Sequence, residues 1–285
     1  MKKTFVTYLV AIVAAALGAL TSCDKDDPII DRGEAVKVES PAGRIFLVQE
    51  NWVGTGNCVI EYYDNVNTAD MVMQGTSTAG KTLTFGVPEL PFEVKNGIRS
   101  SDGKMNYVDG ETNFSIFSGP VPSNIATPDD AVVFSARISG RSNGDYYKVV
   151  YIPNKSVCVG STDVKSAMGN FNTKETSYLI TFLSDTKAEI TVKNAKFAQN
   201  MPSVGDMVFS NLNVAYNEDG FVLTSSSLIP TIAGVPYPSF AISDLRMEVE
   251  LEDLGDADFT FKCSAFGQVF TVDADDMNCL PLTKK

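Results

Sequence analysis

The sequence predicts an all-β protein, built as an antiparallel barrel or sandwich with an additional β region on its N-terminal side. Three observations support this fold class. Short segments of alternating apolar and polar residues recur along the chain, as at Lys81–Phe85. Turn sequences such as Asn143-Gly144 and Asn217–Gly220 separate them. Only one short stretch reads as helical, so a fold that alternates strands with helices is excluded.

The first strands are expected between residues 44 and 118, the N-terminal β region. The pattern predicts strands at Arg44–Val48, Cys58–Tyr63, Lys81–Phe85 and Asn113–Phe117, a Pro-interrupted extended segment at Pro88–Val94, and turns at Asn51–Asn57 and Ser100–Lys104.

The densest group of chain breakers lies between Gly119 and Asp130, where Pro120, Pro122 and Pro128 occur. Such clusters are typical of connections between independently packed parts of a chain. We therefore expect a domain boundary there, with a second domain spanning residues 130–285.

Strand patterns continue through this second domain. One short helix is expected at Asp163–Gly169, with Gly169 as its stop. The expected strands are 132–138, 146–152, 178–183, 188–192, 207–209, 212–216, 221–224, 240–242, 247–251, 259–262 and 269–272.

Composition excludes several function classes. The 285 residues include 23 Lys and Arg against 35 Asp and Glu, a net charge of −12, and 44% are hydrophobic. The negative charge opposes nucleic acid, whose binding depends on Lys and Arg. The chain has no histidine, so Ser-His-Asp and Cys-His catalysis and His-ligated zinc are ruled out.

The N-terminal segment predicts export and lipidation. Lys2 and Lys3 precede an apolar run from Phe5 to Leu20, which is too short to span a bilayer comfortably. The run ends in Leu-Thr-Ser followed by Cys23, which resembles the lipobox of bacterial lipoproteins. We therefore expect residues 1–22 to be a signal peptide and Cys23 to carry the lipid that anchors the protein to the membrane. The alternative is an ordinary secretory signal in which Cys23 is incidental.

The residues after Cys23 indicate the side of the membrane. Asp24, Lys25, Asp26 and Asp27 resemble the surface-export signal of Bacteroidetes lipoproteins, a Lys followed by two acids. The resemblance implies attachment to the outer membrane with the protein facing outward, followed by an acidic linker over residues 23–43. The alternative is a solvated acidic tether without an export role.

Four cysteines remain after Cys23, and four allow three pairings. Cys263 and Cys279 lie in what are expected to be neighbouring strands, so they are the favoured disulfide. The alternative is that Cys58, Cys158, Cys263 and Cys279 are all buried thiols. No pair has the spacing of a redox or zinc motif, and we expect neither a cofactor nor a metal.

The second domain resembles a known family in its turns. Glu189–Phe197, Val204–Phe209, Asn217–Val222, Ile232–Pro236 and Phe240–Ile242 are similar to the calycin-like β-barrel lipoproteins of Bacteroides. The resemblance covers residues 130–285 and implies a small lipocalin-like barrel of unknown ligand, with no catalytic residues to transfer. Residues 44–118 depart from the pattern.

Two groups of side chains are candidates for a site. Acidic clusters at Glu252–Asp258 and Asp273–Asp276 offer hard oxygen ligands for calcium, but neither has EF-hand spacing, and roles within turns are favoured. Trp52 at a hairpin tip and Tyr237 in a Pro-flanked loop are the aromatic residues expected to contact a ligand, because flat rings stack while neighbouring amides form hydrogen bonds.

We therefore expect a binding module for a glycan, lipid or protein, and not an enzyme. Two alternatives remain open. A surface hydrolase using paired carboxylates needs no histidine. A structural adhesin subunit calls for a detachable strand, but the C-terminal residues 277–282 alternate poorly and contain Pro281.

Overall fold

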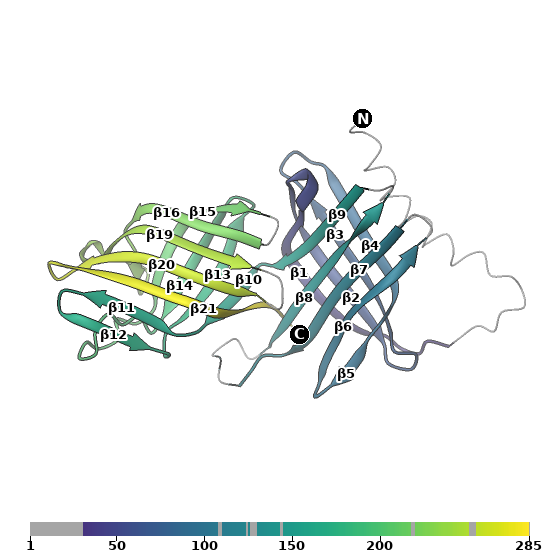
Figure 1. The fold of residues 1–285 in the computed structure, drawn as a ribbon, viewed down its shortest axis with the longest axis horizontal. Helices are drawn as coiled ribbons and strands as arrows, with labels where there is room; N and C mark the ends of the chain where they lie inside the picture. The colour runs from purple at the N-terminus through teal and green to yellow at the C-terminus, as the bar shows by residue number, and fades with distance from the viewer. Residues whose placement is uncertain are drawn as a thin grey trace, which may run out of the picture. The chain divides into compact units, whose positions relative to one another are not determined.

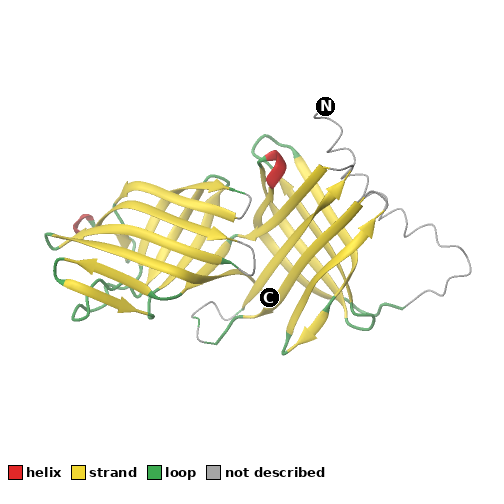
Figure 2. Ribbon diagram, in the orientation of Figure 1, coloured by secondary structure: helices red, strands yellow, loops and turns green. Residues whose placement is uncertain are grey.

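The computed structural model describes residues 31–107, 110–123, 125, 130–142, 145–217, 220–250 and 255–284. The expected all-β fold is confirmed: strands make up most of this part of the chain, and its helices are two short 3-10 turns (Figures 1 and 2). The chain forms two compact units. Unit 1 extends to Pro153 and includes Thr283–Lys285, and unit 2 is Asn154–Leu282.

Unit 1 is one curled antiparallel sheet. Its strands are hydrogen-bonded in the order β4-β3-β2-β1-β9-β8-β7-β6-β5. Its elements are β1 (Val36–Leu47), η1 (Val48–Glu50), β2 (Trp52–Tyr63), β3 (Thr68–Thr76), β4 (Thr82–Pro91), β5 (Glu93–Lys95), β6 (Ile98–Tyr107), β7 (Gly110–Pro120), β8 (Ala131–Ser142) and β9 (Asp145–Pro153).

Unit 2 contains a closed antiparallel barrel of eight strands. Its ladders run β10-β13-β14-β15-β16-β19-β20-β21 and return to β10. These strands are β10 (Lys155–Val159), β13 (Ser177–Ser184), β14 (Lys187–Lys193), β15 (Met207–Tyr216), β16 (Gly220–Leu228), β19 (Ala241–Glu250), β20 (Asp256–Ala265) and β21 (Gln268–Lys284).

Two outer hairpins join this barrel. One consists of β11 (Thr162–Ser166) and β12 (Gly169–Thr173) and pairs with β21. The other consists of β17 (Thr231–Ile232) and β18 (Val235–Pro236), pairs with β15, and precedes η2 (Pro238–Phe240). The helix expected at Asp163–Gly169 is therefore wrong. Val164 is buried between two exposed residues and pairs with buried Phe171, which is the alternation of a strand.

Each unit has its own apolar core. In unit 1, buried side chains from β1, β2, β3, β4, β7, β8 and β9 form one cluster that includes Ile60, Met71 and Phe134. In unit 2, edge-to-face pairs such as Tyr178–Phe259 and Phe209–Phe261, with ring centroids 5.0 and 5.2 Å apart, lie among the buried side chains. Side chains alternate strictly along β20, as the sequence pattern indicated.

The domain boundary lies elsewhere than expected. The Pro-rich segment between Gly119 and Asp130 connects β7 to β8, and these two strands pair directly from Thr112 to Pro120. The structure divides the chain after Pro153 instead. Prolines interrupt hydrogen bonding but do not reveal whether the flanking strands pair with each other, so the cluster marks a connecting loop within unit 1.

The turns expected at Asn51–Asn57 and Ser100–Lys104 are also wrong, since these residues lie almost wholly in β2 and β6. Gly54 and Gly56 suggested a turn, but they serve a different purpose. A Cβ at Gly54 would meet the ring of Trp52, and a Cβ at Gly56 would meet the backbone of β3. Glycine is needed here for close packing within a strand.

Candidate functional site

The two aromatic residues expected to contact a ligand lie in different units and different environments. Trp52 begins β2 and pairs with Leu47 across a hairpin, yet only 9% of it is exposed and it belongs to the unit 1 core. The expectation of an exposed ring at Trp52 is therefore wrong, because the alternation of β2 turns its side chain inward. Tyr237 is 44% exposed and follows β18 in unit 2.

Tyr237 belongs to a cluster of aromatic rings. Its ring centroid lies 5.4 Å from that of Phe240, and Phe240 in turn packs edge-to-face on Phe266 at 5.3 Å. Phe240 is almost fully buried, whereas Phe266 is 70% exposed. The buried rings of Phe197 and Phe270 continue the contacts below Phe240. We call these five residues the aromatic cluster; in it, a buried ring supports two exposed ones.

Two tight turns hold the exposed rings. Ala233 and Gly234 have φ values of +50° and +77° and connect β17 to β18, and the Tyr237 N–H donates to the Pro230 carbonyl at 2.8 Å. Prolines on both sides of Tyr237 restrict its backbone further. η2 and the β20–β21 turn lie at the same end of unit 2 (Figure 2).

Phe266 occupies an unusual backbone position. It has a φ of +53° and, with Gly267, forms the two-residue turn between β20 and β21. Such turns favour Asn, Asp or Gly, since a bulky side chain in the left-handed region is strained. Strain of this kind costs about 1–2 kcal/mol and concentrates at functional sites. A strained and exposed phenylalanine therefore points to a role outside the folded core.

Phe266 was missed from the sequence alone, although a signal was present. The four residues Ala-Phe-Gly-Gln stand between two alternating segments at the place of a two-residue hairpin turn. An aromatic residue there, where a turn-forming residue is expected, was the available indication.

The aromatic cluster lies in uncharged sequence. Residues 197–205, 221–243 and 263–272, which carry all five rings, contain no Asp, Glu, Lys or Arg, although 20% of the whole chain is charged. The neutral polar groups nearby in sequence are amides: Gln199 and Asn200 are exposed on the segment after Phe197, and Gln268 follows the Phe266 turn. Rings and amides of this kind are suited to binding, because the rings stack while the amides form hydrogen bonds.

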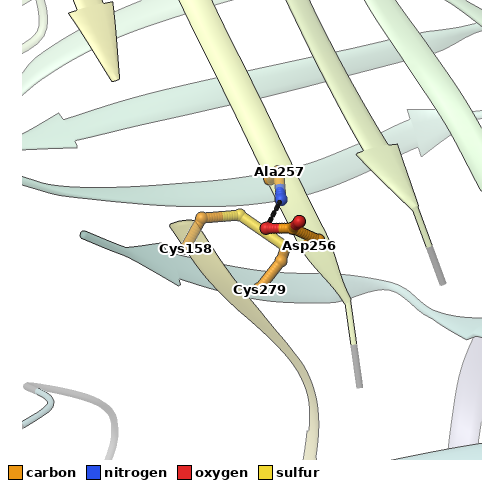
Figure 3. The surroundings of a disulfide bond; sticks show 4 residues. All are labelled: Cys158, Asp256, Ala257 and Cys279. Carbon is orange, nitrogen blue, oxygen red and sulfur yellow. Dashed lines mark hydrogen bonds between the residues drawn. A yellow bond between two sulfur atoms is a disulfide. The ribbon is translucent and has the colours of Figure 1, made fainter. Parts of the chain in front are cut away.

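The disulfide differs from the expected one. Cys158 of β10 is bonded to Cys279 of β21, with Cα atoms 4.0 Å apart, and Figure 3 shows the bond beside Asp256 and Ala257 of β20. The two cysteines are directly opposed in the β10–β21 ladder. Cys263 is opposed to Phe270, so the hairpin register excludes the expected pairing of Cys263 with Cys279. The pairing depends on ladder register, which the sequence does not reveal.

Cys58 and Cys263 are buried free thiols. Burial raises the pKa of Cys263 to about 12 and that of Cys58 well above its usual value. A thiol that stays protonated is a poor nucleophile, so neither residue is suited to cysteine catalysis.

The carboxylates of β20 and β21 have structural contacts. Asp258 Oδ1 accepts the Asp276 N–H at 3.1 Å, and Asp256 Oδ1 accepts the Ala257 N–H at 3.0 Å. Desolvation, and then the charge of Asp273, raise the pKa of Asp275. Among the described residues, no three His, Cys, Asp or Glu side chains are grouped as metal ligands would be. Glu252 and Asp253 lie outside the described residues.

The expected signal peptide, the expected lipidation site Cys23 and the expected export signal Asp24–Asp27 also lie outside the described residues. In the part of the chain that the structure describes, no helix has the length and apolar character needed to cross a bilayer.

Fold and surface together define the class of this protein. It is an all-β protein whose unit 2 is a closed eight-stranded antiparallel barrel, consistent with a calycin-like fold, with an uncharged aromatic cluster at one end. No protein-family model, curated protein or solved structure matches the chain significantly.

Proposed function

We propose that this protein is a non-catalytic binding module that holds a neutral glycan at the aromatic cluster of unit 2. A lipid on Cys23 would anchor it in the outer membrane, with the acidic residues after Cys23 directing it to the cell surface. The observation that carries the proposal is a pair of exposed rings, Tyr237 and Phe266, supported by one buried ring, in segments of the chain that contain no charged residue.

A glycan fits this surface better than a lipid bilayer does. Unit 2 carries 8 basic and 17 acidic side chains over residues 154–282, a net charge of −9. That charge opposes anionic lipid headgroups, which attract Lys and Arg. Pyranose rings present apolar faces that stack on Tyr and Phe, while their hydroxyls bond to amides such as Gln199 and Gln268.

The same charge argues for a neutral glycan. An acidic polysaccharide would be repelled by unit 2 as a whole and would find no cation in the segments of the aromatic cluster. The ordered turns that hold Tyr237 and Phe266 also reduce the entropy lost on binding.

Affinity electrophoresis through gels containing soluble polysaccharides tests the proposal. The probes are a β-glucan, a xylan and a mannan, with polygalacturonate as the anionic counterpart. We expect at least one neutral polymer, and not polygalacturonate, to retard the protein. Tyr237→Ala and Phe266→Ala should each weaken binding about 3- to 10-fold, in line with about 0.5–1.5 kcal/mol per ring contact.

Tyr146→Ala is the matched control, because Tyr146 is a half-exposed tyrosine of unit 1 that lies outside the cluster. It should bind like the wild-type protein. The proposal is refuted if no neutral polymer retards the protein, or if the cluster variants bind as tightly as the control.

A further inference from the structure

Unit 1 contains a groove that the proposed function does not use. Its volume is about 650 Å³, within the range of small-molecule sites. The start of β1, the β5–β6 turn, the end of β7 with the segment after it, and the start of β8 line it.

The groove lies beyond the last residue of β9. This strand lies between β1 and β8, pairing with Gly43–Leu47 of β1 and with Ala136–Ser142 of β8. Its last residue is Pro153, opposite Gly43. The earlier residues of both neighbouring strands, Val36–Val38 and Ala131–Val132, line the groove instead.

The lining is mixed, and apolar residues outnumber polar ones in it. Val38 packs against the unit 1 core, and Pro120, Pro122, Ile125 and Val132 contribute further apolar surface. Such a lining favours a ligand with a hydrocarbon body, because burial of apolar surface contributes about 25 cal/mol per Å².

The charged groups in the lining have one sign. Among the described residues of the lining, the charged ones are Lys37 and Arg99, and both are cations. This is unexpected in a chain in which acids outnumber bases by 35 to 23. The Arg99 side chain is 23% exposed, and its guanidinium lies 5.5 Å from the ring centroid of Tyr62 and is paired with Asp64 at 3.0 Å. Lys37 is paired with Glu39 at 2.8 Å.

These ion pairs leave both cations able to meet a ligand. The side chains of the partners Asp64 and Glu39 are 48% and 40% exposed, and ion pairs near the surface contribute little, about 0–1 kcal/mol, so a ligand anion can compete for either cation. Ser118 adds a neutral polar group to the lining and is hydrogen-bonded to the buried Tyr62 hydroxyl at 2.9 Å.

We propose that this groove binds an anionic amphiphile, a hydrocarbon chain ending in a carboxylate or phosphate. The chain lies along the valines and prolines, and the head group lies toward Lys37 and Arg99. The ligand class follows from the combination of apolar side chains with two cations among the described residues of the lining.

Isothermal titration of the full chain with dodecanoate, below its micelle concentration, tests this inference. Dodecanol has the same chain without the charge, and acetate has the charge without the chain. We expect saturable binding of one dodecanoate per protein, at least tenfold weaker binding of dodecanol, and no measurable binding of acetate. Dodecyl phosphate distinguishes the head groups, since the tighter-binding ligand of the two shows whether the groove prefers a carboxylate or a phosphate.

Lys37→Gln and Arg99→Gln should each weaken dodecanoate binding about three- to tenfold. Lys262→Gln is the matched control, because Lys262 is an exposed, ion-paired lysine of unit 2. Phe266→Ala should leave dodecanoate binding unchanged, which separates this groove from the aromatic cluster. Lys37 is half-exposed, so its variant keeps the test valid if Arg99→Gln disturbs folding.

Equal affinity for dodecanol and dodecanoate would overturn the proposal, as would the absence of saturable binding. The proposal is also overturned if Lys37→Gln binds dodecanoate as tightly as the wild-type protein and Arg99→Gln either does the same or fails to fold.

Discussion

Breaking the Cys158–Cys279 disulfide should destabilise unit 2 and leave unit 1 unchanged. The bond connects residues separated by 121 positions, and constraining a loop of that length in the unfolded chain contributes about 5 kcal/mol in the chain-entropy model. Measured losses for native disulfides are about 2–5 kcal/mol, so we expect a loss of about 3–5 kcal/mol. With a urea m-value of about 2 kcal/mol/M, the midpoint for unit 2 falls by about 2 M.

Two spectroscopic signals separate the units. Trp52 is the only tryptophan of the chain and lies in the unit 1 core, so its fluorescence reports the unfolding of unit 1. Far-UV circular dichroism reports both units. Reduction of the disulfide should lower the urea midpoint of the unit 2 transition seen by circular dichroism and leave the midpoint of the Trp52 fluorescence transition unchanged. Cys158→Ala/Cys279→Ala should reproduce this effect and then be insensitive to reductant.

Cys263→Ala is the matched control, because Cys263 is a buried and unbonded cysteine of unit 2. It should lose only the packing of one side chain and should respond to reductant like the wild-type protein. Alkylation of the denatured, unreduced protein should label Cys58 and Cys263. Labelling of Cys158 and Cys279 under those conditions, a Cys263–Cys279 crosslinked peptide, or no effect of reductant on unit 2 would refute the reasoning.

Two further predictions concern buried tyrosines. Tyr178 and Thr162 share a buried hydrogen bond of 2.8 Å, so Tyr178→Phe should lower the free energy of unfolding by about 1–3 kcal/mol, because it leaves the Thr162 hydroxyl unpaired. The double variant Tyr178→Phe/Thr162→Val should recover most of that stability. Strictly additive losses of the two substitutions in urea unfolding would contradict this. Burial raises the pKa of Tyr62 from 10.0 to about 12, so its stabilisation is complete below pH 10 and falls as pH rises toward 12, because only the unfolded chain releases the proton in that window. Tyr62 should account for about 2–3 kcal/mol of the loss in the Trp52 unfolding transition across that window, beside losses from Cys58 and Tyr151, whose pKa values burial also raises. Tyr62→Phe should remove its share of the pH dependence, and an unchanged slope in the variant would count against the assignment.

The strain at Phe266 connects stability with the proposed function. Phe266→Asn should relax the left-handed backbone while removing the exposed ring, so the two effects on stability partly cancel. A residue retained only for folding would not be expected at a position where it is both strained and 70% exposed. The proposed glycan surface gives a physical reason for its presence.

Much of this protein follows from its sequence alone. Period-two alternation and turn residues predict the all-β class and many strands, because local backbone preferences and the burial of one face act within a few residues. The same reasoning places Tyr237 at the surface, since two prolines and a neighbouring turn keep it out of the core. The absence of histidine excludes whole classes of catalysis without reference to the fold.

Other features depend on contacts between residues far apart in the chain. The sequence shows Gly54 and Gly56 but not the Trp52 ring and the β3 backbone that they accommodate, so a strand looked like a turn. The disulfide partner of Cys279, the pairing of β7 with β8 across a Pro-rich loop, and the groove beyond the end of β9 all depend on ladder register. Register is decided by packing of whole strands, so only the tertiary structure determines which side chains meet.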